Sequence, residues 1–222
     1  MRALLLILTA VIGYVLGNLS GGMILSGYVF RKNRQKYMST KVDFTEFYRD
    51  FGPLGVVLLA VFDILRALAA VLLGGALLGI KDQALVGRLF GLFCLLLGNN
   101  FPVLFLFRGG RGLPCACVGA FLVDWRIGLC CTVAYIVVII FTRYEALGAV
   151  AGAVLAPIFM WIFGFTGLEG VLALLCALLV VIRCAENLVR IVGGTEPRLN
   201  IGKTQPIDDD FDDGDDADDE DF

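Results

Sequence analysis

The chain has 222 residues, of which 59% are hydrophobic, with a mean hydropathy of +0.85 and a formal net charge of −3. Soluble domains contain about 45–50% apolar residues, so this composition excludes an ordinary water-soluble enzyme. Several apolar runs approach the roughly 20 residues that a helix needs to cross a bilayer. We therefore predict an all-α, polytopic integral membrane protein.

The first apolar segment, 3–30, follows a basic residue as a secretory signal does, but further apolar segments come after it, so we take it as the first membrane span. The other segments are 53–80, 85–107, 112–123, 127–142, 146–166 and 168–186. The fourth and fifth are short enough to be tilted or partly interfacial helices. In total we expect about seven transmembrane helices.

The loops predict the orientation of these helices. The loops after the first, third and fifth segments, together with the C-terminal region, hold 13 Lys and Arg residues, whereas the opposite side holds only Arg2, Lys81 and Arg126. Because cytoplasmic loops are enriched in Lys and Arg, we place the N-terminus outside and the C-terminus in the cytoplasm. Every polar cluster of interest then faces the cytoplasm, which predicts a multi-pass membrane protein with a cytoplasmic active face.

The C-terminal end is strongly acidic. Residues 208–222 hold 11 of the 21 acidic residues and no basic residue, so the rest of the chain has 18 basic against 10 acidic residues and a charge of +8. Acidic blocks of this kind are solvated and disordered. We divide the chain into a membrane domain, 1–200, and a disordered acidic cytoplasmic tail, 201–222, for which docking to a partner is the alternative.

The chain contains no histidine and seven cysteines without CxxC spacing, which argues against a zinc or iron site. We expect no metal and no cofactor. Most of the cysteines are expected to pack as small apolar side chains between helices.

Three polar clusters interrupt the apolar pattern, at 39–52, 107–112 and 183–197. In the second, "FRGGRG", arginine offers a planar fork of donors to phosphate oxygens, and glycine lets backbone N–H groups approach an anion. These residues favour a phosphate site at the depth of the lipid headgroups. The alternative is that the arginines fix the topology and the glycines serve helix packing.

Asp63 and Arg66 lie three residues apart within the second segment. Charged side chains inside a membrane are costly and need partners, and this spacing puts them on one helix face. We expect a structural ion pair.

Around these clusters the sequence resembles the bacterial acyl-phosphate:glycerol-3-phosphate acyltransferases (PlsY-type). The segment "GNNFPVLFLFRGGRG", 98–112, is similar to the family's G-H-x-F-P-V…F-K-G-G-K-G, and "ENLVRIVGGTEPRL", 186–199, is similar to its N-I-x-R-L-x-x-G-T-E-P-K-L. The segment "FDILRALAAVLL", 62–73, resembles its L-D-x-x-K-G. The family's first motif aligns with 38–52, where Ser39, Thr45, Arg49 and Gly52 are retained. Asn99 stands where the family has histidine.

The resemblance implies a seven-helix membrane enzyme that transfers a fatty acyl group from acyl phosphate to the 1-hydroxyl of glycerol 3-phosphate, giving lysophosphatidic acid and phosphate in phospholipid biosynthesis. Its partners would be these two substrates and membrane lipids, with no metal and no nucleic acid. The resemblance also implies a location in the bacterial cytoplasmic (inner) membrane. By position, the implied catalytic residues are Ser39, Arg49 and Arg111. The implied substrate-binding residues are Asn187, Gly109, Gly110, Gly112, Gly194 and Glu196.

Two other functions stay open. The changed first motif also fits a catalytically impaired paralogue of the same fold that acts as a phospholipid-binding or scaffold membrane protein. A transporter fits the composition, but it would need polar residues along a path through the membrane, and only Asp63 and Arg66 lie deep within a segment.

Overall fold

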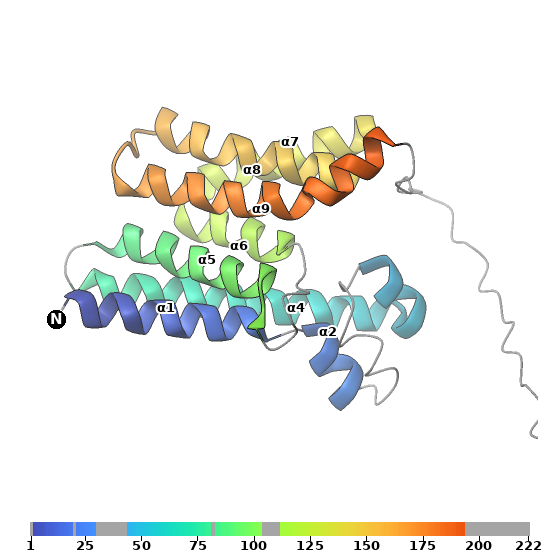
Figure 1. Cartoon of the computed structure of the whole chain (residues 1–222), viewed down its shortest axis with the longest axis horizontal. Coiled ribbons are helices and arrows are strands. Elements are labelled where there is room, and N and C mark those ends of the chain that lie inside the picture. Colours follow the sequence, from blue (N-terminus) through green and yellow to red (C-terminus); the bar gives the residue numbers. More distant parts are fainter. Residues whose placement is uncertain (1, 20, 30–43, 81–82, 104–111, 194–222) are drawn as a thin grey trace, which may run out of the picture.

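The structure is a computed structural model that describes residues 2–19, 21–29, 44–80, 83–103 and 112–193. Within these ranges every regular element is a helix (Figure 1). The elements are α1 (Arg2–Asn18), α2 (Gly21–Ile24), the π-helix η1 (Leu25–Val29), α4 (Phe44–Gly79), α5 (Ala84–Asn100), α6 (Leu113–Val123), α7 (Trp125–Thr142), α8 (Glu145–Ile162) and α9 (Leu168–Val192). The acidic tail, 201–222, lies outside the described residues.

The predicted all-helical, multi-pass membrane architecture is confirmed. Four described helices are long and apolar enough to cross a membrane, namely Asp50–Gly79, Trp125–Thr142, Glu145–Ile162 and Leu168–Val192. Three shorter apolar helices, Ala3–Asn18, Ala84–Asn100 and Leu113–Val123, complete the set of apolar segments. At 1.5 Å per residue, α6 spans only about 16 Å, roughly half of the 30 Å hydrocarbon layer. The count of seven crossings and their orientation stay predictions.

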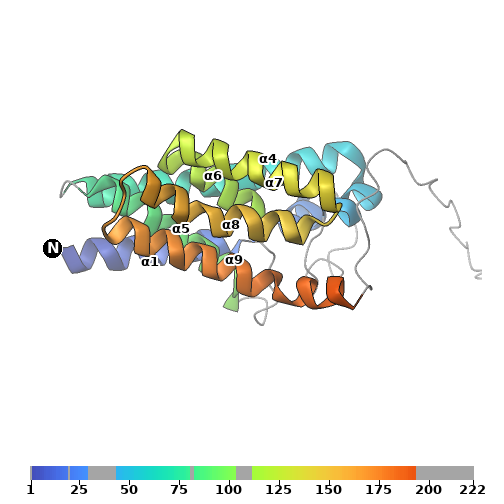
Figure 2. The same cartoon turned by 90° about the horizontal axis from the view of Figure 1, so that it is seen from above.

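The helices form two groups with α6 between them (Figures 1 and 2). In one group α5 packs against α1 and α4, and in the other α8 packs against α7 and α9. The short helix α6 contacts α4, α5 and α7, while α5 also contacts α9. Glycines allow the closest approaches, because a Cβ at Gly17 or Gly74 would collide with the backbone of α5. This close packing through small residues is the usual way in which membrane helices associate.

Four of the seven cysteines are buried between helices, as the sequence predicted for most of them. Cys115, Cys176 and Cys184 are at most 8% exposed and lie in the largest buried apolar cluster, and Cys94 is also buried. They fill space between helices as small apolar side chains do.

Two predicted segments end earlier than expected. The first, 3–30, breaks after Asn18 into α1 and the short elements α2 and η1. The third, 85–107, ends as a helix at Asn100, where Phe101 leaves the helical conformation with φ −128° and ψ 62°. Proline disfavours the helical conformation of the residue before it, and Pro102 therefore explains why α5 stops at this point.

Two other segments extend further than expected. Helix α4 begins at Phe44 rather than 53, with a kink at Gly52 (φ 68°, ψ −170°) just before Pro53. Helix α9 continues to Val192 rather than 186, so Asn187 and Arg190 lie on a helix and not in a loop. The added residues at the start of α4 and at the end of α9 lie at the same end of the molecule, beyond the C-terminal end of α5 (Figure 1).

Candidate functional site

The C-terminal end of α5 forms a buried polar junction, which we define as Asp63, Arg66, Asn99, Asn100 and Gly112. Arg66 Nη2 lies 2.9 Å from Asp63 Oδ1, which confirms the ion pair expected from their spacing. The same nitrogen donates a hydrogen bond to Asn99 Oδ1 at 2.6 Å. Asp63 and Arg66 are each 7% exposed and Asn99 is 8% exposed. The pair is therefore part of a larger network that joins α4 to α5.

Arg66 also holds the end of α1. Its Nη1 donates to the carbonyl oxygen of Leu19 at 2.7 Å and, at 3.5 Å, to that of Gly17. The last carbonyl groups of a helix have no partner within the helix, and an apolar membrane interior offers no water to replace one. Arg66 supplies the missing donors, and this lets α1 end inside the protein.

Asn100 and Phe101 connect the end of α5 to two further helices. Asn100 is completely buried, and its Nδ2 donates to the carbonyl oxygen of Leu179 in α9 at 3.3 Å. The hydroxyl of Tyr14 in α1 donates to the carbonyl oxygen of Phe101 at 3.0 Å. The end of α5 is thus fixed by polar contacts to α1, α4 and α9.

Gly112 places the start of α6 against this junction. It is the N-cap of α6 and adopts a left-handed conformation, φ 68° and ψ 15°. A Cβ atom there would lie 3.0 Å from Asn99 Nδ2 and 3.3 Å from Asn100 Oδ1. Both the backbone angle and the close approach require glycine. The arginine- and glycine-rich segment therefore ends directly on the two buried asparagine amides.

Helices α4 and α9 continue past the junction and carry two of the predicted site residues. From Arg66 back to Gly52, and from Leu179 on to Val192, each helix runs about 20 Å further. Arg49 belongs to the part of α4 before the Gly52 kink, where the structure describes its backbone only. Asn187 lies on the extended part of α9 and is 5% exposed. The start of α4 and the end of α9 therefore lie on two sides of the region just beyond the junction (Figure 1).

The remaining predicted site residues lie outside the described residues. They are Ser39, Gly109, Gly110, Arg111, Gly194 and Glu196. The structure thus places Gly112 and Asn187 and the backbone of Arg49, and the assembly of all nine predicted residues into one site stays a prediction.

The sequence motifs do not reveal the role of the asparagine pair. They mark Asn99 only as the replacement of a family histidine, and they give no role to Asn100. The available signal was the pair of amides at the end of an otherwise apolar helix, just before "FP". Buried amides need hydrogen-bond partners, so such a pair indicates a contact between helices.

A comparison with protein families gives an independent result. The model of the family described as "Glycerol-3-phosphate acyltransferase" matches residues 7–194. Proteins with the same name match over most of their length: that of Shouchella clausii is 33% identical over 87% of this chain and 96% of its own. That of Burkholderia lata is 30% identical over 94% of this chain and 98% of its own.

Solved structures agree on the fold. Two crystal structures of PlsY, an integral membrane glycerol 3-phosphate acyltransferase, one in its glycerol 3-phosphate form and one in its lysophosphatidic acid form, superpose with a TM-score of 0.74. Each is 22% identical to this chain and covers 87% of it and 95% of the crystallised chain. The polar junction therefore belongs to a fold of integral membrane proteins.

Proposed function

The chain belongs to the glycerol-3-phosphate acyltransferase family, and we propose that it transfers a fatty acyl group from an acyl phosphate to the 1-hydroxyl of glycerol 3-phosphate. One observation carries the proposal. The family match spans residues 7–194, a range within which Ser39, Arg49, Arg111 and Asn187 lie. An isolated phosphate-binding motif would not produce a match across the whole membrane domain.

The reaction exchanges one acyl–oxygen bond for another. The 1-hydroxyl oxygen of glycerol 3-phosphate forms an ester bond to the acyl carbon, the bond between that carbon and the phosphate oxygen breaks, and inorganic phosphate leaves. The hydroxyl proton passes to a phosphate oxygen of the bound acceptor. Because the donor is already activated, the protein mainly has to position two anions and neutralise their charge.

The residues of this chain suit that task. Arg49 and Arg111 would neutralise the phosphate groups, with bidentate hydrogen bonds where the geometry allows. Gly109, Gly110, Gly112 and Gly194 would leave backbone N–H groups accessible to phosphate oxygens. The remaining predicted site residues would bind the glycerol hydroxyl groups and the phosphate: Ser39, Asn187 and Glu196.

Asn99 does not act as the base in this proposal. Its amide oxygen accepts a hydrogen bond from Arg66 at 2.6 Å, and its nitrogen lies next to Gly112. A side-chain amide does not take up a proton at neutral pH. This supports proton transfer to a substrate phosphate oxygen rather than to a side chain at this position.

The active face is proposed to be cytoplasmic. The protein is a multi-pass membrane protein, and in the predicted topology most of its loop Lys and Arg residues lie on the side of the predicted site. The positive-inside rule puts this side in the cytoplasm of a bacterial cytoplasmic membrane, where glycerol 3-phosphate has direct access to it.

The test uses the purified full-length chain in detergent with palmitoyl phosphate and glycerol 3-phosphate. We expect phosphate release that depends on glycerol 3-phosphate, with lysophosphatidic acid detected by mass spectrometry. Glycerol as acceptor and palmitoyl coenzyme A as donor are the matched controls, and neither should give product. If the chain releases no phosphate under conditions in which the Shouchella clausii relative turns over, the proposal fails and the phospholipid-binding or scaffold function takes its place.

The Gly112 turn gives a second prediction. Gly112→Ala is expected to lower the turnover number by about 10²-fold, because shifting a positioned group by about 1 Å can cost that much. The added Cβ would push against both asparagine amides. Gly164→Ala is the control, since Gly164 also has a positive φ, 89°, but a Cβ there meets no atom within 4 Å.

Both variants carry a left-handed alanine, which costs about 1–2 kcal/mol. We therefore expect a loss of thermal stability in both variants, measured by tryptophan fluorescence and larger in Gly112→Ala because of the added contacts. Turnover per folded protein should fall only in Gly112→Ala. Equal turnover in the two variants would show that the contact with Asn99 and Asn100 has no part in positioning the site.

A further inference from the structure

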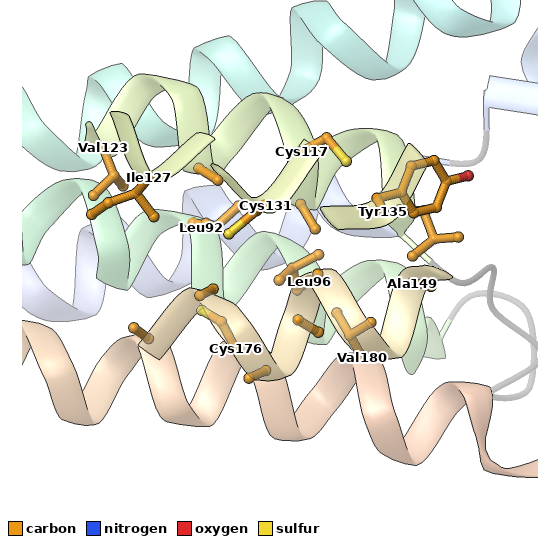
Figure 3. A pocket seen from close by; sticks show the side chains of 18 of the residues that line it. Leu92, Leu96, Cys117, Val123, Ile127, Cys131, Tyr135, Ala149, Cys176 and Val180 are labelled. Carbon is orange, nitrogen blue, oxygen red and sulfur yellow. The ribbon is translucent and has the colours of Figure 1, made fainter. Parts of the chain in front are cut away.

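An apolar chamber lies between α5, α6, α7, α8 and α9 (Figure 3). Helix α8 contributes Ala149, Gly152, Ala153 and Ala156 to its wall. This spacing of three, one and three residues puts them on one helix face. The middle positions of α6 and α9 in the wall are likewise alanine or cysteine. Small side chains on three facing helices leave an elongated space where larger ones would close it.

The chamber begins at the polar junction. Leu113, the first residue after Gly112, lines it, and so does Leu96. The Cδ2 atom of Leu96 lies 3.1 Å from the position that a Cβ of Gly112 would occupy. One end of the apolar space thus lies next to the turn at which the predicted phosphate-binding segment ends.

Three larger side chains line the other end. Val123, Ile127 and Met160 line the chamber there and are 8%, 2% and 1% exposed. They pack in one buried cluster, separate from the cluster that contains Leu96. Figure 3 shows Val123 and Ile127 at the end of the chamber opposite Tyr135 and Ala149. We call these three residues the far wall.

The length of the chamber matches one acyl chain. From Leu113 to Val123, α6 rises by about 15 Å. The hydrocarbon layer of a bilayer is about 30 Å thick, so one leaflet, which holds one extended acyl chain, has about this depth. Apart from the hydroxyl of Tyr135, the lining side chains are apolar or thiols, which suits a hydrocarbon chain.

We propose that the chamber holds the acyl chain of the donor in extended form and that the far wall sets the longest chain the protein accepts. The inference rests on the proposed function, because that reaction brings an acyl phosphate to the polar junction. The carbonyl and phosphate lie at the Gly112 end and the terminal methyl group points to Met160. In an acyl chain longer than the chamber, the extra methylene groups either lie outside it without contacts or push the phosphate group of the donor out of the site.

The test fills the deep part of the chamber. In Ala156→Phe a ring replaces a methyl group close to the far wall, whereas Val154→Phe puts the same ring on the outer face of α8, where Val154 is 45% exposed. We compare kcat/KM for hexadecanoyl phosphate and decanoyl phosphate. Each methylene removed from an apolar site costs about fourfold, so Ala156→Phe should lower the ratio of the two values at least about tenfold. Val154→Phe should leave that ratio unchanged.

A binding experiment separates this inference from the proposed reaction. Hexadecanoic acid with a terminal diazirine is photolysed with the full-length protein in lipid nanodiscs, and the adducts are mapped by mass spectrometry. We expect labelling of the far wall, near Met160, in the wild type and its loss in Ala156→Phe but not in Val154→Phe.

The outcomes are distinct. Far-wall labelling without any phosphate release would overturn the proposed reaction but support the chamber as an acyl-chain site. Turnover with an unchanged chain-length ratio in Ala156→Phe, or labelling spread over the outer faces of the helices, would overturn the inference and leave the reaction standing.

Discussion

Replacing Arg49 or Arg111 by alanine is expected to lower kcat/KM for acyl transfer by about 10²-fold, as the loss of one positioned charge-stabilising donor does in other enzymes. Each guanidinium would face a phosphate group whose charge must be neutralised before two anions can meet. The measurement is acceptor-dependent phosphate release by each variant, divided by the fraction of protein that elutes as folded protein in detergent.

Arginines also orient membrane proteins, so the control must remove a charge from the same predicted face. Arg143 is suitable because it is exposed at the C-cap of α7, on a loop predicted to be cytoplasmic. It has a positive φ of 59°, which asparagine tolerates better than other residues, and the control variant is therefore Arg143→Asn. Full turnover in this variant supports a substrate role for Arg49 and Arg111. An equal loss in all three variants would assign the arginines to topology.

Lysine variants extend this test. Lysine keeps the positive charge but loses the planar fork of donors. Arg111 stands where the related motif has lysine, whereas Arg49 stands where the motif has arginine. We therefore expect Arg111→Lys to keep more turnover than Arg49→Lys. The opposite order would contradict the alignment of these two positions.

Arg66→Met is expected to cause the largest loss of stability of any single change in the described membrane domain. It leaves the buried Asp63 carboxylate without its partner at 2.9 Å and removes the donor from the carbonyl oxygen of Leu19. Breaking one side of a buried ion pair costs about 3–5 kcal/mol. For a chain of this size that corresponds to a fall in melting temperature of roughly 10 °C, which tryptophan fluorescence in detergent can measure.

The double variant Asp63→Leu with Arg66→Met separates stability from positioning. Removing both charges avoids the unpaired carboxylate, and replacing a buried ion pair by apolar side chains is often neutral. We expect most of the melting temperature to return. Turnover should stay low, because Asn99 and the end of α1 still lack the hydrogen bonds of Arg66. If Arg66→Met melts within about 2 °C of the wild type, which corresponds to about 1 kcal/mol or less, the junction does not hold these helices together.

Composition and hydropathy were enough to predict the class of the protein and the approximate positions of its apolar helices. Hydropathy and helix periodicity are local properties, and a bilayer accepts only long apolar helices or closed barrels. The i, i+3 spacing of Asp63 and Arg66 is also a local property of a helix. It was enough to predict their ion pair, which is confirmed. The motifs around Arg49, Arg111 and Asn187 led to the family, which the comparisons confirm over residues 7–194.

Which helix faces meet depends on contacts between distant parts of the chain. Arg66 and Asn99 are 33 residues apart, and Asn100 and Leu179 are 79 residues apart, yet each pair is joined by a hydrogen bond. The ends of α1 and α5 also depend on partners elsewhere in the chain, and the chamber exists because small residues on α6, α8 and α9 face one another. Such contacts depend on how helices pack in three dimensions, and an apolar helix in a membrane carries little local signal of which face will be buried.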